Sequence, residues 1–158
     1  MNTNTLDELF MKKAILLSAS AVTHGNEPFG AVLVKDGTEV CSGENKIYTE
    51  SDPTYHAEFG LLRSFCEKTS IQDLSDYTLY SSCEPCFMCS GAMVWFNLGR
   101  LVYGASNEDL ETILGNKGYS PTDLVFANSF RKPKVTGGIL RNESLEILKQ
   151  YFCNHKKG

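Results

Sequence analysis

The chain has 158 residues, of which 42 % are hydrophobic and 22 % are charged, a composition that is ordinary for a globular protein. This length predicts a single domain over residues 1–158. A net charge of −4 argues against a general polyanion-binding protein, and no stretch is long and apolar enough to predict a membrane span. The six cysteines show no disulfide framework, so we expect a reducing, cytoplasmic compartment.

The first predicted element is a helix over residues 4–22, because apolar side chains recur there at helical spacing. Leu6, Phe10 and Leu17 form the apolar stripe, with Leu9 and Leu16 beside them. We therefore expect this side of the helix to face the core.

Strands and helices alternate along the rest of the chain. Two strand-like runs, 30–35 and 39–45, are joined across Asp36-Gly37, which is a strong hairpin signal. Helices are then predicted over 54–68, 85–96, 107–114 and 143–152, and strands over 76–82, 100–104 and 135–136. Residues 115–133 give no clear pattern. The alternation predicts an α/β fold with one mixed, five-stranded sheet and helices on both faces.

Two short motifs carry residues suited to metal chemistry. Cys86 and Cys89 stand three positions apart, so a helix running through them places both thiols on one face. Pro85 suits the first helical position, and the first turn of a helix favours thiolate, the form that binds metal. With His56 as a nitrogen ligand, the set predicts a three-ligand zinc site whose fourth position is open to water.

Glu58 completes the pattern. A carboxylate beside a zinc-activated water can take up its proton and pass it to a substrate. Residues two apart in a regular helix point in different directions, so we expect His56 and Glu58 at a helix start, with Asp52-Pro53-Thr54 as its entry and cap. The combination H-x-E and P-C-x-x-C is the signature of zinc deaminases.

Three other interpretations of the cysteines are open. Cys83 with His56, Cys86 and Cys89 would make a closed, structural Cys3His zinc site in a non-catalytic domain. The run C-x-x-C-x-x-C is similar to that of bacterial ferredoxins, although the fourth cysteine expected there is missing. Finally, the cysteines can be small buried hydrophobic residues. None of the three explains Glu58, so the catalytic interpretation is favoured.

The sequence resembles the cytidine deaminase superfamily over nearly its whole length. It is most similar to the purine-type branch, which contains bacterial guanine deaminases, plant guanosine deaminases and tRNA wobble-adenosine deaminases. The shared segments are 28–32, 52–58, 82–89 and 91–93, together with Asn45. The resemblance implies a three-layer α/β/α fold, one zinc ion per chain and a homodimer.

The same resemblance implies roles for individual residues. His56, Cys86 and Cys89 match the zinc ligands of the family, and Glu58 matches its proton shuttle. Asn45 matches the residue that hydrogen-bonds the substrate, and the backbone N–H of Ala57 is expected to contact the base. The implied reaction is hydrolytic deamination through zinc-bound hydroxide.

Guanine is the first substrate that the resemblance suggests. Phe29 after Pro28, Cys83 before Glu84, and Trp95 after the second cysteine are more similar to guanine deaminases than to the tRNA enzymes. The rings of Phe29 and Trp95 can stack on a purine. Taken alone, however, each ring is more typical of a core residue.

Other features favour different substrates. Residues 100–105 and 134–140 are more similar to the tRNA branch, which makes tRNA wobble adenosine the alternative, ahead of cytosine or another heterocycle. Tyr55 departs from the small residue usual before the histidine, and a bulky ring there can reshape the pocket. An acid that assists proton transfer in guanine deaminases is expected in 107–123, but the sequence does not choose among Asp109, Glu111 and Asp123. The only compact basic groups that phosphate binding could use are residues 131–134 and 156–157.

Overall fold

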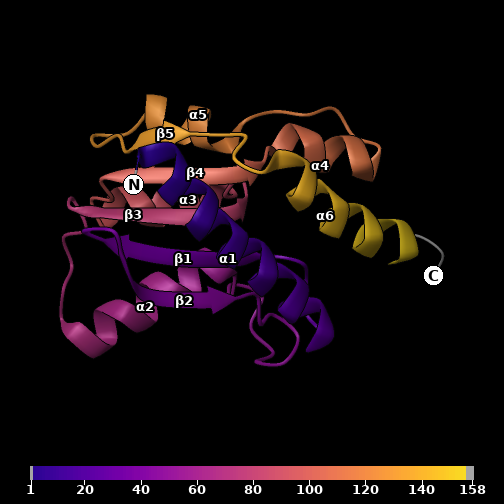
Figure 1. The fold of residues 1–158 in the computed structure, drawn as a ribbon, viewed down its shortest axis with the longest axis horizontal. Coiled ribbons are helices and arrows are strands. Elements are labelled where there is room, and N and C mark those ends of the chain that lie inside the picture. Colours follow the sequence, from indigo (N-terminus) through magenta and orange to yellow (C-terminus); the bar gives the residue numbers. More distant parts are fainter. Residues whose placement is uncertain (1, 156–158) are drawn as a thin grey trace.

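The structure, a computed structural model, describes residues 2–155 as a central sheet with helices on both faces (Figure 1). Its elements are α1 (Thr3–Thr23), β1 (Gly30–Lys35), β2 (Thr38–Glu44), α2 (Ala57–Thr69), β3 (Tyr77–Cys83), α3 (Phe87–Trp95), β4 (Arg100–Ala105), α4 (Asn107–Leu114), α5 (Pro121–Ala127), β5 (Lys134–Thr136) and α6 (Arg141–His155). The predicted alternation of strands and helices is confirmed.

The sheet has five strands in the order β2-β1-β3-β4-β5. β1 pairs antiparallel with both β2 and β3, whereas β3, β4 and β5 pair in parallel. Asp36 and Gly37 join β1 to β2 with φ values of 49° and 70°, the left-handed backbone that a tight two-residue hairpin turn requires. The mixed five-stranded sheet predicted from the sequence is therefore confirmed.

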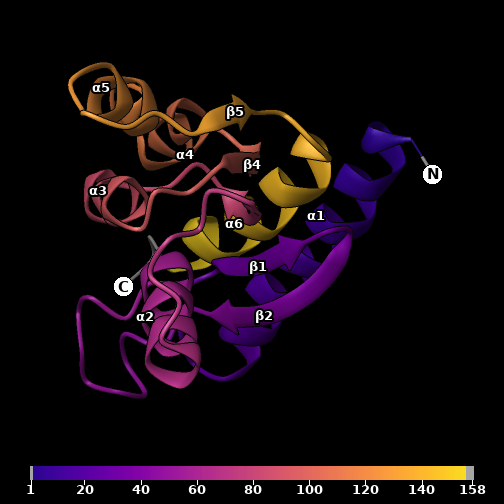
Figure 2. The same ribbon diagram turned by 90° about the vertical axis from the view of Figure 1, so that its left-hand side faces the viewer.

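Side chains alternate between the two faces of the sheet and divide the core in two. In β1, Ala31 and Leu33 pack with residues of α2 and α3, while Val32 and Val34 pack with residues of α1. Figure 2 shows α2, α3 and α5 on one side of the sheet and α1 on the other. This gives the expected three layers, in which β1 is buried on both of its faces.

The buried face of α1 differs from the predicted stripe. Leu9 and Leu16 are 45 % and 66 % exposed, so the expectation that they face the core is wrong. The helix instead turns a neighbouring set of side chains to the sheet, and these are Asp7, Phe10, Met11, Ala14, Ile15, Ser18 and Ala21. Small and polar residues take part in this face, which an apolar stripe cannot reveal.

α5 was not predicted. Ser120 caps it, because its Oγ accepts a hydrogen bond from the backbone N of Asp123 at 3.2 Å, and Pro121 occupies the first turn. The sequence Ser-Pro-Thr-Asp carried this start signal, but the helix that follows it has only seven residues, about two turns.

The C-terminal helix α6 is longer than the predicted range 143–152. The basic pair at 156–157 lies outside the described residues. Within residues 2–155, no helix has the length and hydropathy needed to cross a membrane.

Candidate metal centre

The two motifs lie at the starts of α2 and α3, which pack next to each other on the same face of the sheet (Figure 2). His56 is the N-cap of α2 and Cys86 is the N-cap of α3. Their backbone is extended, with ψ of 154° and 177° respectively. Both helices therefore begin later than the predicted starts at 54 and 85, and those two boundaries are wrong.

Asp52 forms a turn rather than the predicted helix cap. Its Oδ1 accepts hydrogen bonds from the backbone N of Thr54 at 2.9 Å and from the Thr54 hydroxyl at 2.7 Å. This turn leads the chain into α2 so that His56 and Glu58 fall at the helix start, as their spacing predicted.

The side chains of His56, Cys86 and Cys89 converge, with their ligand atoms within 4.8 Å of one another. His56 Nδ1 is 3.5 Å from Cys86 Sγ and 3.7 Å from Cys89 Sγ. A tetrahedral zinc ion, about 2.3 Å from sulfur and 2.0–2.1 Å from nitrogen, requires donors about 3.5 Å apart. Both nitrogen–sulfur distances therefore fit a zinc ion bound by the three donors.

The structure also decides between the interpretations of the cysteines. Cys83 is buried, and its thiol contacts the carbonyl of Ser106 at 4.0 Å instead of joining the ligand cluster. A closed Cys3His site is therefore excluded, and a cluster with only two thiolates does not fit an iron–sulfur centre. The three-ligand set leaves a coordination position for water.

The two ligand thiols differ in how strongly they hold a proton. A hydrogen bond from Cys89 lowers the pKa of Cys86 to about 4, helped by His56 and opposed by burial. The same hydrogen bond, together with burial, raises the pKa of Cys89. Cys86 is therefore poised as a thiolate, and a dication bound here would displace the proton of Cys89.

Glu58 lies beside the ligands in the first turn of α2 and is 5 % exposed. Its Oε1 is 2.7 Å from the Ser81 hydroxyl, and its Oε2 is 3.7 Å from Cys89 Sγ. Burial raises the pKa of Glu58, although the hydrogen bond with Ser81 opposes this shift. A carboxyl group whose pKa is raised accepts a proton more readily, as a group that takes up and returns a proton must.

Asn45 follows β2 and is 1 % exposed. Its Oδ1 accepts hydrogen bonds from the backbone N of Ile47 at 3.2 Å and of Glu27 at 3.4 Å. Its buried Nδ2 has no hydrogen-bond partner among the described residues. An unpaired buried donor costs about 1–3 kcal/mol, so this amide is available to a ligand that supplies an acceptor.

A cavity of about 150 Å³ adjoins the ligands. Its lining comes from four parts of the chain, and the residues are Glu27, Phe29, His56, Glu58, Glu84, Cys86, Asn107 and Leu110. Three of these side chains are carboxylic acids, and none is lysine or arginine.

Of the two aromatic rings expected at the substrate, the structure brings one to the cavity. Phe29 lines it and packs on Phe152, with ring centroids 6.4 Å apart. Trp95 is the last residue of α3, about 12 Å along the helix from the ligand end. Its side chain is 75 % exposed, and its ring contacts that of Phe130. Ala57, the first residue of α2, follows His56 directly.

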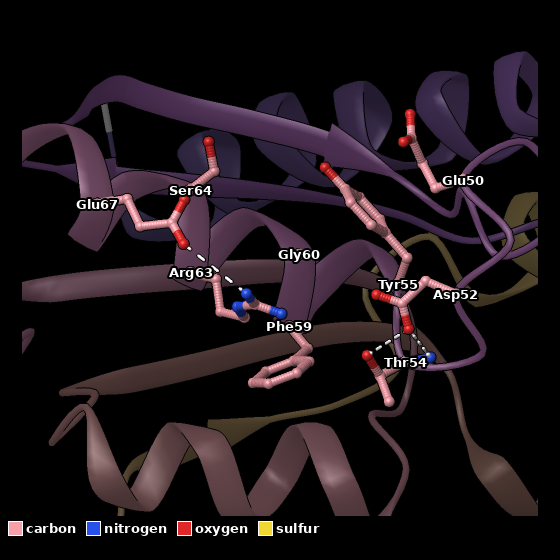
Figure 3. A pocket seen from close by; sticks show the side chains of 9 residues that line it. All are labelled: Glu50, Asp52, Thr54, Tyr55, Phe59, Gly60, Arg63, Ser64 and Glu67. Carbon is pink, nitrogen blue, oxygen red and sulfur yellow. Dashed lines mark hydrogen bonds and ion pairs between the residues drawn. The ribbon is translucent and has the colours of Figure 1, made fainter.

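Tyr55 does not enter this cavity. Its ring lies over Gly60, so that a Cβ at Gly60 would come within 2.7 Å of Tyr55 Cε1, and Lys46 Nζ is 5.7 Å from the ring centroid. Tyr55 instead lines a separate hollow of about 270 Å³ along the outer side of α2, together with Arg63 and Phe59 (Figure 3). The expected reshaping of the substrate pocket by this ring is not observed.

Sequence reasoning assigned no role to Glu84 or Glu27, both of which line the cavity. Glu84 directly precedes the P-C-x-x-C motif that begins at Pro85, so its position in the sequence already suggested that it lies near the metal ligands. Glu27 precedes Pro28, and only its contacts across the chain reveal it.

The three acids considered for proton transfer lie elsewhere. Asp109 closes a capping box with Ser106 and pairs with Arg141. Glu111 accepts a hydrogen bond from Asn116 at 2.9 Å, and Asp123 lies exposed in the first turn of α5. None of the three lines the cavity.

Residues 4–105, which include both motifs, match the profile of the cytidine and deoxycytidylate deaminase zinc-binding region. The chain belongs to this deaminase family. It is therefore a zinc-dependent deaminase of the nucleobase and nucleoside class, and its His/Cys/Cys cluster is the zinc site typical of that family.

The similar proteins are named for two different activities, deamination of guanine and deamination of adenosine in tRNA. This deaminase is 43 % identical to guanine deaminase of Bacillus subtilis over 103 residues, which are 65 % of this chain and 66 % of that protein. It is 36 % identical to the tRNA-specific adenosine deaminase of Buchnera aphidicola over 151 residues, which are 96 % and 91 % of the two chains. A solved guanine deaminase from Nitrosomonas europaea superposes with a TM-score of 0.79 at 27 % identity, covering 92 % of this chain and 84 % of the other.

Proposed function

We propose that this deaminase hydrolyses the amino group of a free aminopurine base or its nucleoside, with guanine as the first substrate. The observation that carries the proposal is the small cavity beside Glu58 and the metal ligands. Its volume of about 150 Å³ lies below the roughly 300–1,000 Å³ of pockets for drug-sized ligands. A single flat base matches a cavity of this scale better than a nucleotide does.

The charges of the lining support an uncharged substrate. Phosphate groups are bound by lysine, arginine or clustered N–H donors, whereas this cavity contains three carboxylic acids and no lysine or arginine. Glu27 is the acid with the fewest contacts, since its Oε1 is 3.5 Å from the Tyr48 hydroxyl and it forms no ion pair with any described residue. A carboxylate with only this one long hydrogen bond favours N–H or O–H donors of a base or a sugar and disfavours phosphate.

The residues then take complementary roles. Zinc, when bound, supplies an activated water at neutral pH. Glu58 moves protons at the reacting atoms, and Ser81 holds Oε1 of its carboxylate. Asn45 offers its free Nδ2, and the N–H of Ala57, which has no intrahelical partner in the first turn, offers a second donor to the base. Phe29 gives an aromatic wall on which a purine can stack.

Editing of a tRNA wobble adenosine is the second candidate. The full-length similarity to tRNA-specific adenosine deaminases favours it, and so does one surface feature. Trp95 and Phe130 are 75 % and 67 % exposed, with Arg131 stacked on Phe130 and the exposed Lys132 beside them. Exposed rings beside cations are suited to unpaired RNA bases and phosphates.

Ammonia release decides between the two candidates. Zinc-loaded protein is assayed with guanine, guanosine, adenosine and a tRNA anticodon stem–loop, each against Glu58→Ala. Release from guanine or guanosine that is absent in the variant supports the proposal. Release from the stem–loop alone, weakening steeply with salt, overturns it in favour of tRNA editing.

The homodimer implied by the family resemblance belongs to the same proposal. Sedimentation of the zinc-loaded protein tests it, and a monomer at all concentrations contradicts it.

A further inference from the structure

Glu84 is a buried carboxylic acid in the cavity wall that the proposed chemistry does not use. It is 5 % exposed and forms no ion pair with any described residue. A buried carboxylate is stable only when hydrogen-bond donors replace its water. Its partners therefore indicate what it does.

The donors to Glu84 come from the starts of two helices. Its Oε2 accepts from the backbone N of Asn107, the first residue of α4, at 2.9 Å. Its Oε1 accepts from the hydroxyl of Ser120, the N-cap of α5, and from the hydroxyl and backbone N of Thr122 at 2.6 and 3.4 Å. One carboxylate thus lies at the positive ends of both helices, where negative charge is favoured.

Glu84 also belongs to the segment 84–86 that carries the ligand Cys86, here called the metal loop. Glu84 is followed by Pro85 and the ligand Cys86, and its backbone N donates to the carbonyl of Ala105 at 2.8 Å, which ties the end of β3 to the end of β4. Glu84 therefore connects the metal ligand, the edge of the sheet and the two helices.

The start of α4, which Glu84 holds, forms one part of the cavity wall. Asn107 and Leu110 of α4 line it, and Asn107 Nδ2 donates to the carbonyl of Tyr119 at 3.0 Å. The ring of Tyr119 stacks on Phe87, next to the ligand Cys86, with centroids 5.6 Å apart and planes 17° apart. The wall and the metal loop thus meet in two places, and the polar contact runs through Glu84.

We propose that Glu84 is a positioning residue, which fixes the wall formed by Asn107 and Leu110 relative to the zinc ligands and so sets the affinity for substrate. The inference rests on the deaminase reaction proposed above. It concerns substrate binding rather than the proton transfers of Glu58.

The test is Glu84→Gln, which keeps the side-chain shape. It replaces one accepting oxygen with an NH2 group, which then faces the hydrogen-bond donors of α4 or α5. We expect KM for the aminopurine substrate to rise by about 10-fold or more, kcat to fall by less than KM rises, and one zinc per chain to remain. Amide hydrogen exchange in residues 106–122 of the substrate-free, zinc-loaded protein should quicken. Glu108→Gln, an exposed acid on α4, is the matched control and should change none of these.

A second variant covers a failure of Glu84→Gln to fold. Thr122→Val removes one donor to Glu84 at constant shape and should raise KM severalfold. Thr122→Ser keeps the hydroxyl, so its KM should stay close to that of the wild type.

Three results overturn the inference. They are unchanged KM and exchange in folded Glu84→Gln, loss of zinc in parallel with activity, and equal effects of Thr122→Val and Thr122→Ser. If the wild-type protein releases no ammonia from any aminopurine, the proposed function fails. The exchange comparison between Glu84→Gln and Glu108→Gln then still decides whether Glu84 holds the wall.

Discussion

At the scale of single residues, the cavity uses three glutamic acids in three different ways. Glu58 is held by Ser81 beside the metal ligands, Glu84 is saturated by donors from two helix starts, and Glu27 stands almost free. In the proposed functions the same side chain would serve proton transfer, positioning and recognition, because its surroundings differ.

Glu58→Ala should retain zinc and lose about 10²–10⁴-fold in kcat, because proton transfer to and from the substrate is removed while the three ligands stay in place. Steady-state kinetics and zinc content of the same preparation check this. Glu108→Gln serves as the exposed control. Activity near that of the wild type would rule out Glu58 as the proton shuttle.

Glu27→Gln should change preference among substrates. Removing the negative charge should raise kcat/KM for a 5′-phosphorylated nucleoside relative to the free base by roughly 3- to 10-fold, since repulsion of phosphate is lost. Competition between the two substrates measures the ratio. Glu50→Gln, on an exposed loop outside the cavity, controls for net charge, and an identical ratio in both variants contradicts the role of Glu27.

At the scale of elements, the ligand spacing predicted the centre because it depends on short segments. His56, Glu58, Cys86 and Cys89 needed only two helix starts that meet, and the strand pattern supplied the sheet that brings them together. The local errors concern helix boundaries and the buried face of α1, whereas the residues that were missed depend on contacts between distant segments. Ser120 lies 36 positions from Glu84, and no local pattern reports such a pairing.

Trp95 illustrates the same limit. Sequence similarity placed it near the substrate, but its position at the distal end of α3 and its exposure depend on how α3 packs with α5. Its substrate contact within one chain is unsupported, while the surface that it forms with Phe130 remains a prediction for RNA.

The packing of Tyr55 on α2 predicts coupling between two positions. Gly60→Ala alone should bring little gain or a loss, because the new Cβ meets the Tyr55 ring at 2.7 Å. In a Tyr55→Ala background the same change should stabilise by about 1 kcal/mol through helix propensity. Urea unfolding of the four proteins gives the interaction energy, and strictly additive effects contradict the contact.

At the scale of the whole molecule, an ion pair between the buried Asp7 and the half-buried Arg100 joins α1 to the sheet. Arg100 donates to both oxygens of Asp7 at 2.8 and 2.7 Å, and the Tyr80 hydroxyl donates to Asp7 at 2.8 Å. Burial would raise the pKa of Asp7, but these hydrogen bonds and the charge of Arg100 outweigh it and lower the pKa below its usual value.

Asp7→Asn should therefore destabilise the protein in a pH-dependent way. A carboxylate with a lowered folded-state pKa stabilises above its unfolded value of about 3.9, and this stability is lost as pH falls through the folded value. The difference in free energy of unfolding should be about 3–5 kcal/mol near pH 7 and shrink below about pH 4. Glu39→Gln breaks the exposed pair with Lys13 and should cost no more than about 1 kcal/mol; a pH-independent loss in Asp7→Asn contradicts the ionic role.

The N-cap positions of His56 and Cys86 leave most of each helix free of the metal. Only the first turns of α2 and α3 carry donor atoms. In the later turns Leu62, Phe65 and Met93 are buried in the core, whereas exposed positions such as Trp95 can change without moving a donor atom. Tolerance to substitution should therefore be greatest at the exposed positions of the later turns. Such a layout lets surfaces at the distal ends diversify, and one catalytic centre can be kept while new partners are acquired.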